Sequence, residues 1–145
     1  MTHEDRGHYA KKHPSNRKVD PRVAEAVKQA VREDGIPCAA AFKVVNDLGV
    51  PPEEVGFTID SLETPLIKCQ LGLYGYGQGN RLIVEPMESV TEELEEAIRE
   101  SLIDGRLPCK VAWELAEKFN MGRMDITSAC EAMKIRIFSC QLGAF

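Results

Sequence analysis

The residues with the clearest capacity for chemistry are four cysteines that form two pairs with the same spacing. Cys38 and Cys69 lie as far apart in the sequence as Cys109 and Cys140. Thiolates bind zinc and iron–sulfur clusters and undergo redox reactions. The closely spaced cysteine pairs typical of metal sites are missing, however, and alternation with apolar residues favours buried cysteines. We therefore expect no metal or cofactor, and keep metal or redox sensing by these cysteines as an alternative.

A glycine-rich stretch is the second candidate for chemistry. Gly75, Gly77 and Gly79 are spaced as in some phosphate-binding loops. Such loops lead into a helix whose N-terminus faces the anion, and the residues after Gly79 favour a strand instead. We interpret this stretch as the tip of a hairpin. The sequence also shows no spacing typical of a nucleophile with its base, or of paired catalytic carboxylates. We expect a protein that is not an enzyme.

These residues belong to a unit that occurs twice, the second copy lying at one constant displacement from the first. Pro37-Cys38 falls on Pro108-Cys109, and the segment Cys69–Gly72, Cys-Gln-Leu-Gly, falls on Cys140–Gly143. No insertion or deletion is needed between these matches, and the apolar positions recur in the same register. Self-similarity at a fixed period is typical of a duplicated structural unit.

The helices of the unit follow from apolar spacing and from capping residues. Asp20-Pro21 is typical of a helix start, and Ser89–Glu92 resembles a capping box at the start of the second copy. A second helix is predicted over about 38–48. A third is predicted from Pro52 to about Leu62, with its counterpart over about 123–133.

A turn residue joins the second helix to the third in both copies. Gly49 and Asn120 occupy corresponding positions, and these two residue types enter the left-handed region most readily. A small residue four positions earlier, Val45 or Ala116, fits a close crossing of the two helices. The pattern predicts a helix-turn-helix.

Short strands are predicted around these helices. Residues 36–38 predict a one-bridge strand, and alternating apolar residues predict a longer strand around Ile67–Leu71, with its counterpart over 135–142. Residues 81–84 predict a further strand that completes a wing in the first copy only. The second copy ends before any wing strand.

This order of elements resembles tandem winged-helix proteins of the kind found among bacterial and archaeal regulators. The resemblance covers residues 20–145 in pattern. It implies a mainly helical α+β fold with two helix-turn-helix units. We predict a flexible basic tail over 1–19, a first repeat over 20–88, and a second repeat without a wing over 89–145.

Charge and hydropathy limit the location and the partners of the chain. The net charge is −5, but residues 1–22 carry six basic and three acidic residues. No apolar run approaches the ~20 residues that span a bilayer, and the N-terminus lacks the apolar stretch of a signal peptide. We expect a cytoplasmic protein that does not bind membranes.

DNA-binding transcriptional regulation is the first functional hypothesis, and it rests on the resemblance. In that mode the third helix enters the major groove and basic residues contact phosphate. The third helix of the first copy carries no basic residue, so the second copy and the tail are the expected contacts. The candidate residues are Arg123, Thr127, Ser128, Lys134, Arg136, Lys68, Arg81, Lys11, Lys12, Arg17 and Lys18.

A protein-interaction module is the alternative hypothesis. The third helix of the first copy is acidic and would meet a basic protein partner or a second copy of the chain. Its candidate contacts are Glu53, Glu54, Asp60 and Glu63.

Overall fold

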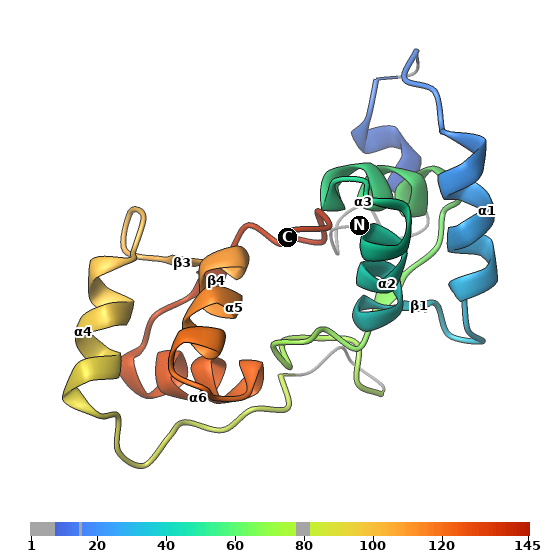
Figure 1. Cartoon of the computed structure of the whole chain (residues 1–145). Coiled ribbons are helices and arrows are strands. Elements are labelled where there is room, and N and C mark those ends of the chain that lie inside the picture. Colours follow the sequence, from blue (N-terminus) through green and yellow to red (C-terminus); the bar gives the residue numbers. More distant parts are fainter. Residues whose placement is uncertain (1–7, 15, 78–81) are drawn as a thin grey trace. The chain divides into compact units, whose positions relative to one another are not determined.

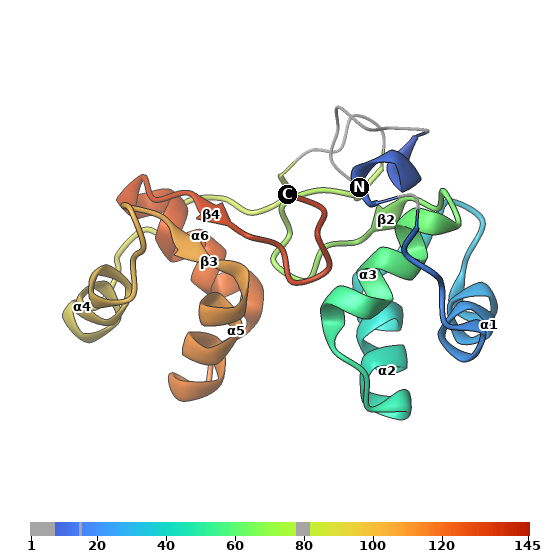
Figure 2. The ribbon, with the colours of Figure 1, turned by 90° about the horizontal axis from the view of Figure 1, so that it is seen from above.

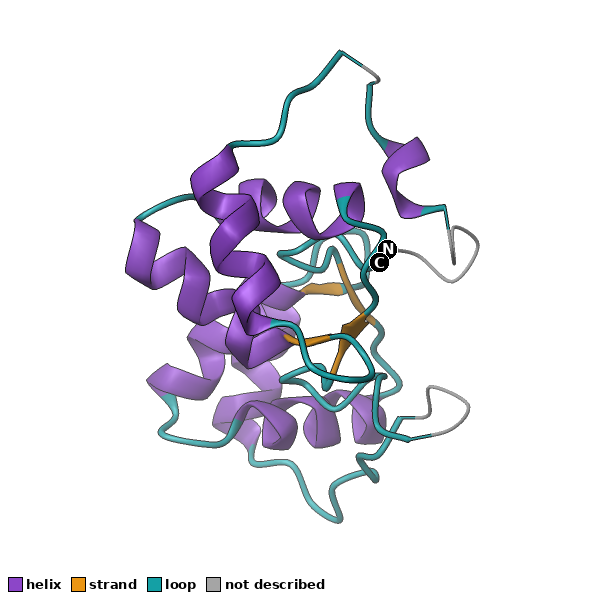
Figure 3. Ribbon diagram, turned by 90° about the vertical axis from the view of Figure 1, so that its right-hand side faces the viewer, coloured by secondary structure: helices purple, strands orange, loops and turns teal. Residues whose placement is uncertain are grey.

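The computed structural model describes residues 8–14, 16–77 and 82–145 and divides the chain into two units. Unit 1 contains the described residues up to Cys69 together with Gln141–Phe145, and unit 2 contains Gln70–Cys140. The boundary therefore falls after residue 69, whereas the sequence placed it after residue 88. Both units combine helices with very short strands, so the fold is mixed α+β (Figure 1, Figure 3).

In unit 1, three helices pack against one another (Figure 1, Figure 2). A short 3-10 helix precedes them, and two paired strands of two residues each follow the first and the third of these helices in the chain. The elements in chain order are η2 (Tyr9–Lys12), α1 (Pro21–Ala30), β1 (Ile36–Pro37), α2 (Cys38–Leu48), α3 (Pro52–Ser61) and β2 (Leu66–Ile67).

Unit 2 repeats the order of the elements from α1 to β2, and each element begins at the position that the repeat alignment assigns to its counterpart. No helix among the described residues is long and apolar enough to cross a membrane. The elements of unit 2 are α4 (Glu92–Glu100), β3 (Leu107–Pro108), α5 (Cys109–Lys118), α6 (Arg123–Met133) and β4 (Ile137–Phe138).

The helix starts have local chemical causes. The side chain of Asp20 accepts a hydrogen bond from the backbone N–H of Arg22 at 2.9 Å, which confirms the predicted start of α1. In unit 2 the capping residue is Thr91, whose hydroxyl accepts from the N–H of Leu94 at 3.3 Å. The predicted capping box with Ser89 as its first residue is therefore wrong by two positions.

The turns between the second and third helices have the predicted backbone conformation. Gly49 has φ 65° and Asn120 has φ 53°, so both lie in the left-handed region. Val55 and Ile126 follow in the third helices, and both side chains are fully buried. The apolar spacing identified from sequence therefore marks the core of each unit.

The strands are shorter than predicted and their pairing is parallel. β1 pairs with β2, and β3 with β4, each over two residues. The strand predicted to continue to Leu71 ends because Lys68 has φ 50°, and Ser139 ends the counterpart with φ 55°. Residues 82–84 form no strand, so the predicted wing strand is absent from its described part; Arg81 lies outside the described residues.

The repeated Cys-Gln-Leu-Gly segment contains a leucine, and in each unit the leucine that packs is the one from the other repeat. Leu142, from the end of the second repeat, belongs to unit 1 and is 2% exposed. Leu71, from the end of the first repeat, belongs to unit 2 and is fully buried. The two repeats of the sequence are thus not the two units of the structure, because their terminal segments are exchanged.

Candidate functional site: the acidic face of α3

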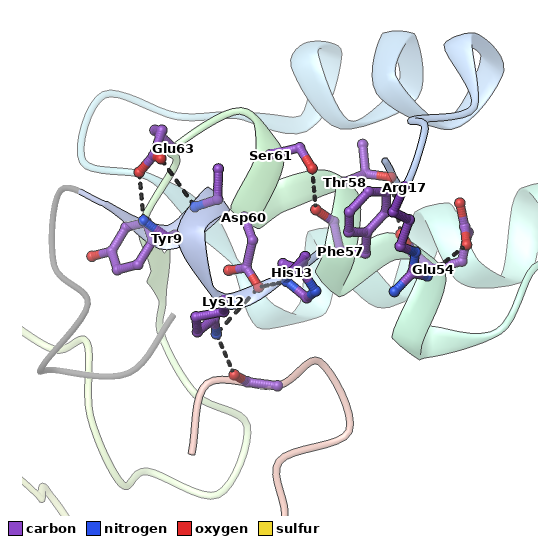
Figure 4. Close-up of polar contacts among 12 residues, drawn as sticks. Tyr9, Lys12, His13, Arg17, Glu54, Phe57, Thr58, Asp60, Ser61 and Glu63 are labelled. Carbon is purple, nitrogen blue, oxygen red and sulfur yellow. Dashed lines mark hydrogen bonds and ion pairs between the residues drawn. The ribbon is translucent and has the colours of Figure 1, made fainter. Parts of the chain in front are cut away.

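The acidic face of α3 is covered by the segment that precedes α1 (Figure 4). We call residues 8–14 and 16–19 the N-terminal arm. The arm holds η2, and the side chain of Tyr9 within it is 6% exposed. The part of the predicted flexible tail that the structure describes therefore lies against the folded unit.

Asp60 is the buried centre of this contact. Its carboxylate lies 2.7 Å from Nε2 of His13 and 3.2 Å from Nζ of Lys12, and its side chain is 2% exposed. Burial raises the pKa of Asp60, because the charged form loses hydration. The hydrogen bond from His13 and the charge of Lys12 oppose this effect only in part.

Glu63 holds the other end of the arm through backbone groups. Its carboxylate accepts hydrogen bonds from the N–H of Tyr9 at 2.6 Å and from the N–H of Ala10 at 3.0 Å. These are the first N–H groups of η2, which have no acceptor inside the helix. An acidic side chain at the end of α3 thus fixes where the arm begins its helical turn.

Arg17 fastens the far end of the arm by two different contacts. Its guanidinium donates to Glu54 at 3.1 Å and lies over the ring of Phe57, 3.8 Å from the ring centroid. The imidazole of His13 meets the same ring edge-on at a centroid distance of 4.9 Å. Phe57, which is 3% exposed, therefore packs between two basic side chains of the arm.

The arm also contacts the C-terminal segment within unit 1. Nζ of Lys12 donates to the carbonyl of Gly143 at 2.9 Å (Figure 4). α3 is consequently enclosed along its second half, where every residue from Val55 to Asp60 is buried. Of the four predicted acidic contacts, only Glu53 does not bind the arm. It lies at the start of the helix and is exposed.

In unit 2 the corresponding segment covers α6 with different chemistry. The hydroxyl of Ser128 donates to the carbonyl of Glu85 at 2.5 Å, and the carbonyl of Ser128 accepts from the N–H of Met87 at 3.0 Å. Ser128 occupies the position of Phe57 in unit 1. Hydrogen bonds to its backbone groups therefore hold the segment in unit 2, whereas charged side chains hold the arm in unit 1.

The residues predicted to bind nucleic acid differ in exposure and in the contacts that they make. Thr127 is 1% exposed, and Ser128 is engaged by the segment over α6. Arg123 is exposed, but it donates to Gln70 at 3.1 Å and lies 3.6 Å from the ring centroid of Trp113. The other predicted contacts form two groups. Lys12 and Arg17 bind α3, and the remaining described ones, which are all exposed, are Lys11, Lys18, Lys68, Lys134 and Arg136.

None of the cysteines, all of which lie within the described residues, forms a disulfide. Cys38, Cys69 and Cys109 are buried and Cys140 is half-buried. Among the described residues, no group of three or more histidine, cysteine or acidic side chains is arranged to hold a metal ion. A fifth cysteine, Cys130, is buried in α6, and burial raises the pKa of its thiol to about 12. That thiol stays protonated and unreactive at neutral pH.

The raised pKa of Asp60 predicts how stability depends on pH. Folding favours its protonated form, so its contribution is fully present below the ordinary value of 3.8 and is lost as pH rises through the folded pKa. In Asp60→Asn this loss is removed, so the variant gains stability relative to wild type as pH rises above that ordinary value. Urea unfolding at a series of pH values measures the difference. Asp34→Asn, in an exposed turn, is the matched control; parallel profiles for wild type and Asp60→Asn would contradict the assignment.

The sequence interpretation missed that the basic tail and the acidic helix bind each other. The signal was present as opposite charge, because residues 1–22 carry an excess of basic residues and 52–63 carries acidic residues and no basic one. The pairing depends on where the arm turns back, which no local pattern predicts.

No model of a known protein family matches the chain, and no curated protein or solved structure is significantly similar to it.

Proposed function

We propose that the chain is a non-enzymatic protein-interaction module whose α3 binds a basic peptide segment. The observation that carries the proposal is the set of contacts between α3 and the arm. Three acidic residues of the α3 region bind Lys12, His13, Arg17 and two backbone N–H groups. In the structure the chain's own arm occupies this face, and a partner would bind by displacing it.

The character of the contacts supports exchange of the arm for a partner. Arg17 and Glu54 have side chains that are 39% and 29% exposed, and ion pairs of that exposure contribute little net stability. A competing segment with the same charges can replace them at small cost. The contacts also define what it must offer: a cation for Asp60, and further along the segment an arginine to pair with Glu54 and cover Phe57.

Recognition of DNA by α6, as the resemblance to winged-helix regulators implies, has less support from the contacts. A recognition helix needs free polar side chains on one exposed face. Thr127 is buried, Ser128 is bonded to Glu85, and Arg123 is engaged with Gln70 and Trp113. Protein interaction through unit 1 is therefore the better-supported function.

A peptide with the sequence of residues 8–19 tests the proposal. In the full-length variant Lys12→Glu/Arg17→Glu the arm is repelled from α3, and the labelled peptide is expected to bind with a dissociation constant on the order of 0.1–1 mM. The wild-type chain binds it at least about tenfold more weakly, because the tethered arm competes at high effective concentration. Fluorescence anisotropy measures both, and Lys12→Gln/Arg17→Gln serves if the first variant does not fold.

Two controls decide the outcome. A peptide in which the lysine and arginine matching positions 12 and 17 are replaced by glutamate should not bind. Adding Glu54→Gln and Glu63→Gln to the released chain should abolish binding of the original peptide. Equal binding of both peptides, or no binding to either released variant, would overturn the proposal.

A further inference from the structure

Four exposed basic residues lie around the strand pair of unit 2. Arg106 directly precedes β3, Arg136 directly precedes β4, Lys110 lies in the first turn of α5, and Lys134 follows α6. We call these four residues the unit 2 basic cluster. The corresponding positions of the first repeat hold no basic residue; they are Gly35, Ala39, Glu63 and Pro65.

The strand pairing brings two arginines of the cluster side by side. Leu107 is in register with Ile137, and its N–H donates to the carbonyl of Arg136 at 2.9 Å. Leu107 and Ile137 are buried, so Arg106 and Arg136, one position earlier, project from the opposite face. Neighbouring strands lie about 4.8 Å apart, and the two guanidinium groups therefore start from adjacent backbone positions.

Like charges in adjacent positions on paired strands repel each other. None of the four cations forms an ion pair with another described residue, although Asp104 and Glu131 are near them in sequence. The guanidinium of Arg106 lies over the ring of Phe138 instead, 4.2 Å from its centroid. An anion bound between the two arginines would offset the repulsion that the fold leaves in place.

We infer that the unit 2 basic cluster binds the phosphate backbone of a nucleic acid. Arginine matches phosphate with two parallel hydrogen bonds, which suits a site built on two of them. Ile103 pairs with Arg106 across a tight turn and is 53% exposed, so an apolar surface for a base or sugar lies beside the charges. The site uses the strand pair and not α6, and it is independent of the peptide site on α3.

Titration of the full-length chain with labelled single-stranded and duplex oligonucleotides tests this inference. At about 50 mM salt the wild type is expected to bind, with log K falling against log salt at a slope of about −3 for three to four phosphate contacts. Arg106→Gln/Arg136→Gln should reduce the magnitude of that slope by about 2 and the affinity by at least tenfold. The matched control Arg22→Gln/Lys28→Gln removes two exposed charges from α1 and should keep both values.

Three results would overturn the inference. One is the absence of binding by the wild type at about 50 mM salt, where non-specific affinity is greatest. Another is an equal loss in both double variants, which would show a general charge effect and no site. The third is binding of a phosphoserine peptide in preference to either oligonucleotide, which would assign the cluster to a phosphoprotein. Circular dichroism of each variant verifies that the helices are intact.

Discussion

Gly56→Ala is expected to destabilise unit 1 by more than about 2 kcal/mol. The sign is the informative part, because in an open helix alanine is more favourable than glycine by up to about 1 kcal/mol. A Cβ at position 56 would overlap the backbone oxygen of Leu142 and lie 2.8 Å from its carbonyl carbon. Those atoms belong to the backbone, so no rotamer change removes the clash. The C-terminal segment would have to leave α3.

Deleting residues 141–145 provides the control for this prediction. If the clash with Leu142 is the cause, Gly56→Ala costs nothing further in the shortened chain and even stabilises it. Urea unfolding of the four chains in this double-mutant cycle yields the coupling energy. An equal cost of Gly56→Ala in both backgrounds would place its effect elsewhere in α3.

Leu142→Ala and Leu71→Ala are each expected to lower the free energy of unfolding by about 2–5 kcal/mol. Leu142→Ala should destabilise unit 1, and Leu71→Ala should destabilise unit 2. Both side chains are buried, so truncation leaves a cavity as well as losing apolar contact. Leu142 ends the second repeat but packs in unit 1, and Leu71 ends the first repeat but packs in unit 2. Each substitution should therefore destabilise the unit that is built mainly from the other repeat.

Hydrogen exchange distinguishes the two units. Leu142→Ala should reduce amide protection in α1, α2 and α3, whereas Leu71→Ala should reduce it in α4, α5 and α6. The fluorescence of Trp113, the single tryptophan, reports on unit 2 and should respond to Leu71→Ala. Leu82→Ala, at a side chain that is 40% exposed, is the control and should cost little. If each variant instead lost protection in the helices of the repeat that contains the substituted leucine, the exchange of terminal segments between the two units would be contradicted.

The C-terminal segment and the N-terminal arm both contact α3, and this links stability to the proposed function. Lys12 contacts both Asp60 of α3 and the carbonyl of Gly143 in the exchanged segment. Displacing the arm would therefore remove a contact from the C-terminal segment as well. Peptide binding on α3 and the packing of residues 141–145 are expected to influence each other.

Local signals in the sequence determined most of the secondary structure. Asp20-Pro21 started α1, Gly49 and Asn120 supplied the left-handed turns, and the apolar spacing identified Val55 and Ile126 as core. These features succeed because capping, turn geometry and helical periodicity depend on neighbours within a few residues. The constant displacement between corresponding elements was readable for the same reason, since each copy keeps its own local pattern.

Only the tertiary structure decided the partners of the segments that lie between and beyond the helices. Lys68 and Ser139 end their strands with positive φ, a conformation that neither residue type signals in sequence. The exchange of Leu71 and Leu142, and the return of the arm to Asp60, join residues far apart along the chain. Such contacts are selected by burial and charge in the completed fold, where the acidic face of α3 and the basic arm first become neighbours.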